Sequence, residues 1–120
     1  MEAYGIPVDV MTCDPEHYVR CALMLDAVRH LPPEVMEILH YHEWTLREPG
    51  GYEMFCALNC RTTPTLLVNG ERKFENYIPT VDELYGALMS EARTEEQRLV
   101  LSTAWRRANQ EYPVRAATLT

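Results

Sequence analysis

The fold of this chain is decided by one stretch, Thr62-Thr63-Pro64-Thr65-Leu66-Leu67-Val68-Asn69-Gly70. Its apolar, β-branched part, residues 65–68, predicts a short buried strand. The Asn-Gly dipeptide that follows favours a two-residue hairpin turn, because both central residues of such a turn need a positive φ. A returning strand is expected over residues 72–77. The stretch therefore predicts an antiparallel hairpin.

The segments before this hairpin alternate between strand and helix patterns. The apolar run at residues 6–11 predicts a strand, and Asp14-Pro15 then favours a helix start. Apolar residues recur at helical spacing until Pro32-Pro33 ends the helix. A second strand is expected over 35–41, a loop over 45–51 and a short helix over 52–58. A strand-helix-strand start predicts a parallel pair.

Two capping boxes mark helices after the hairpin. Thr80-Val81-Asp82-Glu83 opens a helix that continues through Leu88, and Thr94-Glu95-Glu96-Gln97 opens another. The last helix carries an apolar face formed by Leu101, Ala104, Trp105, Ala108 and Tyr112. This face either packs on its own domain or docks on a partner subunit with Trp105 as the anchor.

The predicted class is thus α/β, a mixed sheet in the order β-α-β-α-β-β-α with an added C-terminal helix. The expected division is a domain over residues 1–92, a helical extension over 93–112 and a tail over 113–120.

The length, net charge and cysteine content of the chain exclude some classes of function and favour others. The 120 residues suit one domain with an ordinary core, and the net charge of −7 argues against nucleic acid as a partner. No run of about 20 apolar residues is present, so membrane insertion is not expected. The acidic start of the chain has no basic n-region, which predicts a cytoplasmic protein. Four cysteines in a reducing compartment favour metal binding or redox work over structural disulfides.

Residues 62–70 resemble the strand of thioredoxin-like proteins that begins at a cis-proline, and residues 78–84 resemble the entry to their last helix. Cys13, just after the first strand, matches the position of their reactive cysteine. The resemblance covers roughly residues 5–92 and implies a thioredoxin-like fold. A helix starting beside Cys13 would stabilise its thiolate. Glu16, however, stands where thioredoxins carry the second cysteine of their motif, so exchange through that motif is not expected.

The remaining cysteines extend the resemblance. Cys56 and Cys60 form a C-x3-C pair just before Pro64, as in the thioredoxin-like [2Fe-2S] ferredoxins and the related small subunit of respiratory complex I. This resemblance implies a [2Fe-2S] cluster held by Cys13, Cys21, Cys56 and Cys60. It also implies one-electron transfer in the service of a larger oxidoreductase.

Three alternatives stay open. In a thiol-disulfide redox protein, Cys13 is the nucleophile and Cys56 or Cys60 its resolving partner. In a zinc protein, the same four cysteines form a structural site. In a non-catalytic interaction or assembly subunit, the fold is kept without the chemistry. For the single residues, the simpler interpretations are a buried core thiol for Cys60 and a helix position facing away from the site for Cys21. Ligation by Cys21 requires residues 14–20 to be loop.

The sequence also places His40 and His42 on one face of the second strand, because side chains alternate along a strand. Two histidines are few for a metal site, and a solvated strand face is the simpler interpretation.

Overall fold

The computed structural model of the chain describes the backbone of residues 5–119 and the side chains of residues 5–110. The elements follow in chain order as β1 (Ile6–Thr12), α1 (Val19–Arg29), α2 (Pro33–Met36), β2 (Leu39–Thr45), α3 (Gly51–Ala57), β3 (Thr65–Val68), β4 (Glu71–Glu75), α4 (Val81–Ser90) and α5 (Glu95–Leu119). No helix in the described part of the chain is long and apolar enough to cross a membrane.

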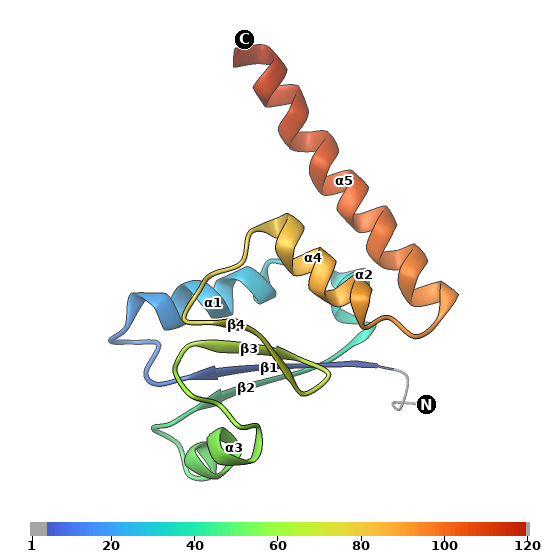
Figure 1. The fold of residues 1–120 in the computed structure, drawn as a ribbon. Coiled ribbons are helices and arrows are strands. Elements are labelled where there is room, and N and C mark those ends of the chain that lie inside the picture. Colours follow the sequence, from blue (N-terminus) through green and yellow to red (C-terminus); the bar gives the residue numbers. More distant parts are fainter. Residues whose placement is uncertain (1–4, 120) are drawn as a thin grey trace.

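The strands form one four-stranded sheet in the order β2-β1-β3-β4. β1 pairs in parallel with β2 and antiparallel with β3, which in turn pairs antiparallel with β4. Helices α1, α2, α4 and α5 lie on one side of this sheet and α3 lies on the other (Figure 1). The predicted α/β class, parallel pair and antiparallel hairpin are confirmed.

The hairpin has the predicted turn. Asn69 and Gly70 both have positive φ, 55° and 80°, and β3 covers the four residues expected of it. The returning strand β4 is shorter than expected and ends at Glu75. The peptide bond between Thr63 and Pro64 is cis.

Two apolar clusters hold the layers together. Alternate residues of the two central strands, among them Val8, Val10 and Leu66, point toward α1 and α4 and form the main core. The opposite face carries a smaller cluster of Met11, Cys60 and Leu67, which α3 covers. Because only this short helix lies on the second face, much of that face is left without a helix over it (Figure 1).

The second strand lies further along the chain than predicted. Residues 33–36 form α2 and the strand runs over 39–45 instead of 35–41, so the loop expected from Thr45 begins only after that residue. Pro33 is the first residue of α2, a position that its fixed φ and missing N–H suit. Pairing with β1 then sets the strand, because Ile6 lies opposite Leu39 and Thr12 opposite Thr45.

The first helix also starts later than predicted. α1 begins at Val19, not at Asp14-Pro15. The Asp14 carboxylate accepts a hydrogen bond from the Glu16 N–H (3.1 Å), and the Asp14 carbonyl accepts one from the Tyr18 N–H (2.9 Å). The Asp14 side chain therefore closes a turn within the loop, and Cys13 is not at a helix N-terminus.

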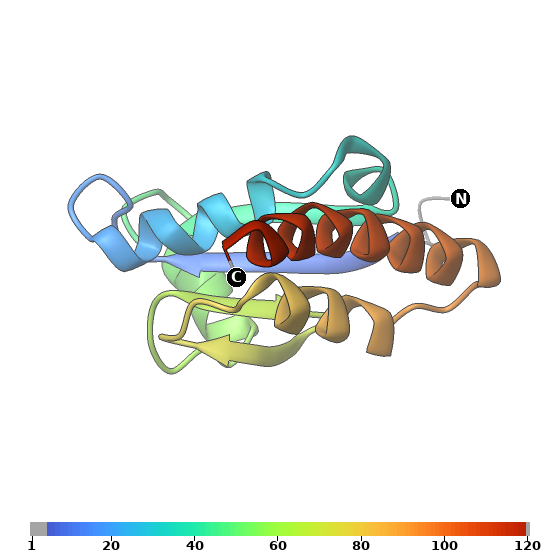
Figure 2. The same cartoon turned by 90° about the horizontal axis from the view of Figure 1, so that it is seen from above.

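Both predicted capping boxes are present at the last two helices. α5 lies beside α4 (Figure 2), and its residues Leu101 and Ala104 are buried in the main core. The first half of α5 thus packs on its own domain. The helix continues to Leu119, through most of the segment expected to be a tail, and the Tyr112 side chain lies outside the described residues.

Candidate functional site

Cys13 and Cys21 come together at the end of β1. Cys13 is half-buried and its carbonyl accepts a hydrogen bond from the Thr45 hydroxyl (2.7 Å), which fixes the backbone there to the end of β2. Its N–H donates to the sulfur of Cys21 at 3.4 Å. Cys21, only 2% exposed, lies in the first turn of α1. The turn at residues 14–18 therefore brings two cysteines with seven residues between them into one site.

Asp14 holds the loop between these cysteines. Its carboxylate, 13% exposed, contacts Nδ1 of His17 (2.5 Å) and Nη1 of Arg47 (3.3 Å) in addition to the Glu16 N–H. Burial disfavours the charged carboxylate, but the hydrogen bonds and the positive charge of Arg47 outweigh it and lower the pKa of Asp14. Asp14 therefore makes contacts within the loop, to Glu16 and His17, and one contact to Arg47 in the segment after β2.

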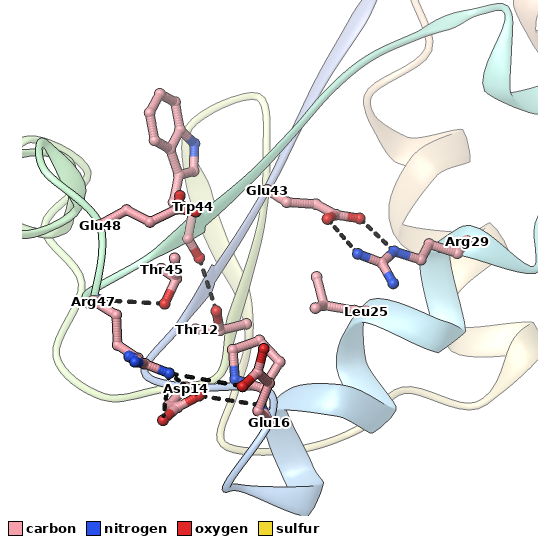
Figure 3. A pocket seen from close by; sticks show the side chains of 11 residues that line it. Thr12, Asp14, Glu16, Leu25, Arg29, Glu43, Trp44, Thr45, Arg47 and Glu48 are labelled. Atoms are coloured by element: carbon pink, nitrogen blue, oxygen red, sulfur yellow. Dashed lines mark hydrogen bonds and ion pairs between the residues drawn. The ribbon is translucent and has the colours of Figure 1, made fainter.

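An open cavity of about 670 Å³ lies beside this loop (Figure 3). On one side of the cavity Arg47 donates a hydrogen bond to the Asp14 carboxylate. On the other side Arg29 of α1 donates two hydrogen bonds, of 2.7 and 2.6 Å, to the Glu43 carboxylate of β2. The lining residues are Thr12, Asp14, Pro15, Glu16, Leu25, Arg29, Glu43, Trp44, Thr45, Arg47 and Glu48. Four carboxylates and two guanidinium groups give this cavity a net negative lining.

Cys56 and Cys60 lie on the side of the sheet that α3 covers. Cys56 is exposed on α3, next to the phenol of Tyr52, whose pKa is raised by the hydrogen bond between them. Cys60 follows the helix and is 8% exposed, packed with Met11 and Leu67. Burial raises the pKa of the Cys60 thiol.

The four cysteines therefore occupy two places. Cys21 belongs to α1 on one side of the sheet, and Cys60 packs beneath α3 on the other. Among the described residues, no group of three or more histidine, cysteine, aspartate or glutamate side chains is placed to hold a metal ion. A [2Fe-2S] cluster takes four protein ligands. The cluster stays a prediction from the sequence, and it requires the second cysteine pair to approach the first.

The resemblance to the [2Fe-2S] ferredoxins grouped Cys13 with Cys21, but the helical pattern by itself did not, because it extended the first helix back over the residues that form the turn. The signal was Asp14 itself, since an aspartate side chain can bond the backbone N–H two residues on and favour a turn. Arg47 contacts Asp14 and Thr45 donates to the Cys13 carbonyl, but the residues around Arg47 and Thr45 in the sequence give no indication of these contacts. We find no matching family model, no matching curated protein and no matching solved structure for this chain.

Proposed function

We propose that this chain is a small thioredoxin-like redox protein whose working group is the dithiol formed by Cys13 and Cys21. The observation that carries the proposal is the contact between the Cys13 N–H and the Cys21 sulfur at 3.4 Å. The strand order β2-β1-β3-β4 supports the thioredoxin-like part. So does the sheet register, in which Met11 pairs with Thr65, because it brings Cys13 alongside the residues just before β3.

The two sulfurs differ in access, which assigns their roles. Cys13 is half-buried and Cys21 almost fully buried, so an incoming disulfide reaches Cys13 first. The Cys13 thiolate attacks one sulfur of the partner disulfide, forming a mixed disulfide and releasing the other partner sulfur as a thiolate. Cys21 then loses its proton and attacks the Cys13 sulfur. The internal disulfide forms, the second partner thiol leaves, and two electrons and two protons have passed to the partner.

The partner is a protein disulfide or another disulfide-bearing molecule that docks over the cavity beside the loop. Asp14, Glu16, Glu43 and Glu48 outnumber Arg29 and Arg47 around that cavity, and the whole chain carries a net charge of −7. Opposite charge speeds encounter between proteins. A partner with basic residues around its disulfide is therefore favoured.

The test uses glutathione disulfide in a Cys56→Ser background, which removes the one exposed cysteine. This parent protein is expected to end without a glutathione adduct and with an internal disulfide, as read by intact mass. Cys21→Ala in the same background is expected to stop as a glutathione adduct on Cys13, because the resolving thiol is gone. Cys60→Ser is the matched control and is expected to behave like the parent.

A stable glutathione adduct on Cys13 in the parent would contradict the dithiol proposal. Cys21 is buried, so each variant is first compared with the parent by circular dichroism and thermal unfolding. Cys21→Ser, of nearly equal volume to the cysteine, is the second variant. A parent that forms no internal disulfide while both variants are folded would also contradict the proposal.

One observation favours a second candidate, one-electron transfer through a [2Fe-2S] cluster. Residues 14–18 form a turn and the Cys13 N–H contacts the Cys21 sulfur, which favours ligation by Cys13 and Cys21, although residues 19 and 20, also expected to be loop for this ligation, belong to α1. Cys56 and Cys60 would complete the ligand set. Protein purified without oxygen would then contain about two irons and two acid-labile sulfides per chain, and Cys56→Ser would lose them. The dithiol proposal predicts protein with neither.

A further inference from the structure

The edge strand β2 carries an exposed pair of histidines that the redox proposal does not use. β2 is at the edge of the sheet and pairs only with β1. His40, His42 and Trp44 alternate with Tyr41 and Glu43, so they point to the side of the sheet that carries α3. Both histidines are exposed, and their ring centroids are 4.9 Å apart.

We propose that His40 and His42 bind one divalent transition-metal ion. Zinc and similar ions lie about 2.0 to 2.1 Å from imidazole nitrogen, and the ring centroid lies about 1.1 Å further back. Two imidazoles that share an ion at a near-tetrahedral angle therefore have centroids about 5 Å apart. The distance between the His40 and His42 ring centroids matches this value. The angle of 63° between the two ring planes shows that the rings are not stacked face to face.

The nitrogens of this pair are available. Neither imidazole has a hydrogen-bond partner among the described residues, whereas Nδ1 of His17 contacts Asp14 and Nδ1 of His30 contacts the Asp26 carbonyl. His40 and His42 therefore differ from the other two histidines of the chain, because neither nitrogen of either ring has a hydrogen-bond partner in the described structure.

Asp9 lies opposite His42 in the sheet register but is not a third ligand. Its carboxylate accepts a hydrogen bond from the Trp44 indole N–H at 2.8 Å, and no three-residue metal group is found among the described residues. The site supplies two nitrogens and leaves the other coordination positions to water. Such a site selects by ligand type: imidazole suits Cu²⁺, Ni²⁺ and Zn²⁺ and does not suit Mg²⁺ or Ca²⁺.

Trp44 gives the site its own optical signal. The His42 ring stacks on the Trp44 ring, with centroids 5.8 Å apart and planes 23° apart. A paramagnetic ion on His42 would therefore quench Trp44 fluorescence. Trp105, the other tryptophan, lies on α5 across the sheet and serves as an internal reference.

The experiment titrates Ni²⁺ into the Cys13→Ser/Cys56→Ser protein, in which the two more accessible thiols cannot compete for metal. We expect saturable quenching at one ion per chain, absent in Trp44→Phe. His40→Ala and His42→Ala are each expected to weaken Ni²⁺ binding about tenfold or more. Once one imidazole holds the ion, the other binds it intramolecularly, and removing either histidine loses this gain. The matched controls His17→Ala and His30→Ala are expected to bind as the parent does.

Mg²⁺ at the same concentration is expected to leave the fluorescence unchanged. Quenching that survives both His40→Ala and His42→Ala, or that His17→Ala or His30→Ala removes equally, would overturn the site. So would the absence of any saturable Ni²⁺ binding. The thiols proposed for redox work are not needed in this titration, so its outcome is independent of the proposed function.

Discussion

Cys56, in α3, and Cys60, after it, are separated by only three residues, yet their side chains have different surroundings. Cys56 is exposed, whereas Cys60 is 8% exposed and its thiol pKa is raised by burial. The thiolate is the species that reacts with alkylating reagents. We therefore expect N-ethylmaleimide at neutral pH to modify Cys56 quickly and Cys60 slowly, with Cys60 gaining rate at alkaline pH. Timed digestion and mass spectrometry would measure both rates.

Denaturant provides the control for that experiment, since it exposes both thiols and should bring their rates together. Equal rates in the folded protein at neutral pH would contradict the buried placement of Cys60.

Glu43 makes the stability of the protein depend on acid pH. Its side chain accepts two hydrogen bonds from Arg29 and one from the Tyr41 hydroxyl, which lower its pKa although desolvation opposes the shift. A folded-state pKa below the ordinary value of about 4.5 stabilises the folded protein above that pH. This contribution is lost as pH falls from the ordinary value through the lower folded-state pKa.

Glu43→Gln is accordingly expected to lower the free energy of unfolding at neutral pH by about 0.5 to 1 kcal/mol, the range for a partly exposed pair. The difference between this variant and the parent should vanish in acid. Urea unfolding at a series of pH values would measure it. Glu37→Gln is the control, because Glu37 is exposed and has no ion pair among the described residues. A difference that grows in acid would contradict the assignment.

Asp14 illustrates what could not be predicted at this scale. The residue suits a helix start as well as a turn, and the choice depends on partners that lie far along the chain. Arg47 contacts its carboxylate and Thr45 holds the neighbouring Cys13 carbonyl. Neither partner is recognisable from the residues around Asp14.

At the scale of elements, the approach of α3 to the end of β2 depends on one glycine. A Cβ added at Gly51 would lie 1.9 Å from the Thr45 carbonyl oxygen, whereas a Cβ at Gly86, within α4, meets no atom within 4 Å. Gly51→Ala is therefore expected to destabilise the protein by about 1 to 3 kcal/mol, because backbone must move. Gly86→Ala is expected to stabilise it by up to about 1 kcal/mol, because alanine favours the helix.

Urea unfolding of the two glycine variants compares the same chemical change at two positions. If Gly51→Ala were as stable as the parent, the close approach of α3 to Thr45 would be wrong.

Elements with local signals were predicted well from the sequence. The Asn69-Gly70 turn and both capping boxes depend on residues within four positions of one another, and all three are present. The second strand was placed four residues too early. Its start depends on pairing with β1, and Val35 suits α2 as a buried helical residue just as it suits a strand.

At the scale of the whole molecule, α5 belongs to the domain that it follows. Leu101 is fully buried in the main core, while Leu99, two residues earlier on the same helix, is 63% exposed. Leu101→Ala is expected to lower the free energy of unfolding by about 2 to 5 kcal/mol, and Leu99→Ala to change it by less than about 0.5 kcal/mol. Chemical denaturation of the full chain measures both. Equal effects would mean that α5 does not pack as described.

Trp105, the residue considered as an anchor for a partner, also contacts its own domain. Its indole N–H donates to the Asp82 carboxylate at 2.8 Å, and the side chain is 39% exposed. Whether the face of a helix meets its own domain or another chain depends on where the whole helix lies, and the apolar pattern of α5 alone did not decide it.

The pairing of cysteines is likewise a property of the whole molecule. The sequence drew attention to all four cysteines and to the position of Cys13 after the first strand. Apart from the ferredoxin resemblance, which grouped Cys13 with Cys21, the residues alone could not tell which cysteine would approach Cys13, because that depends on where α1 begins and on which side of the sheet α3 lies.

The most direct test of the dithiol proposal is disulfide mapping of the oxidised wild-type protein. The chain is equilibrated with excess glutathione disulfide, the remaining thiols are blocked at acid pH, and the digest is analysed by mass spectrometry. We predict one internal disulfide, between Cys13 and Cys21. A disulfide from Cys13 to Cys56 or Cys60, or oxidised protein without any internal disulfide, would contradict the assignment.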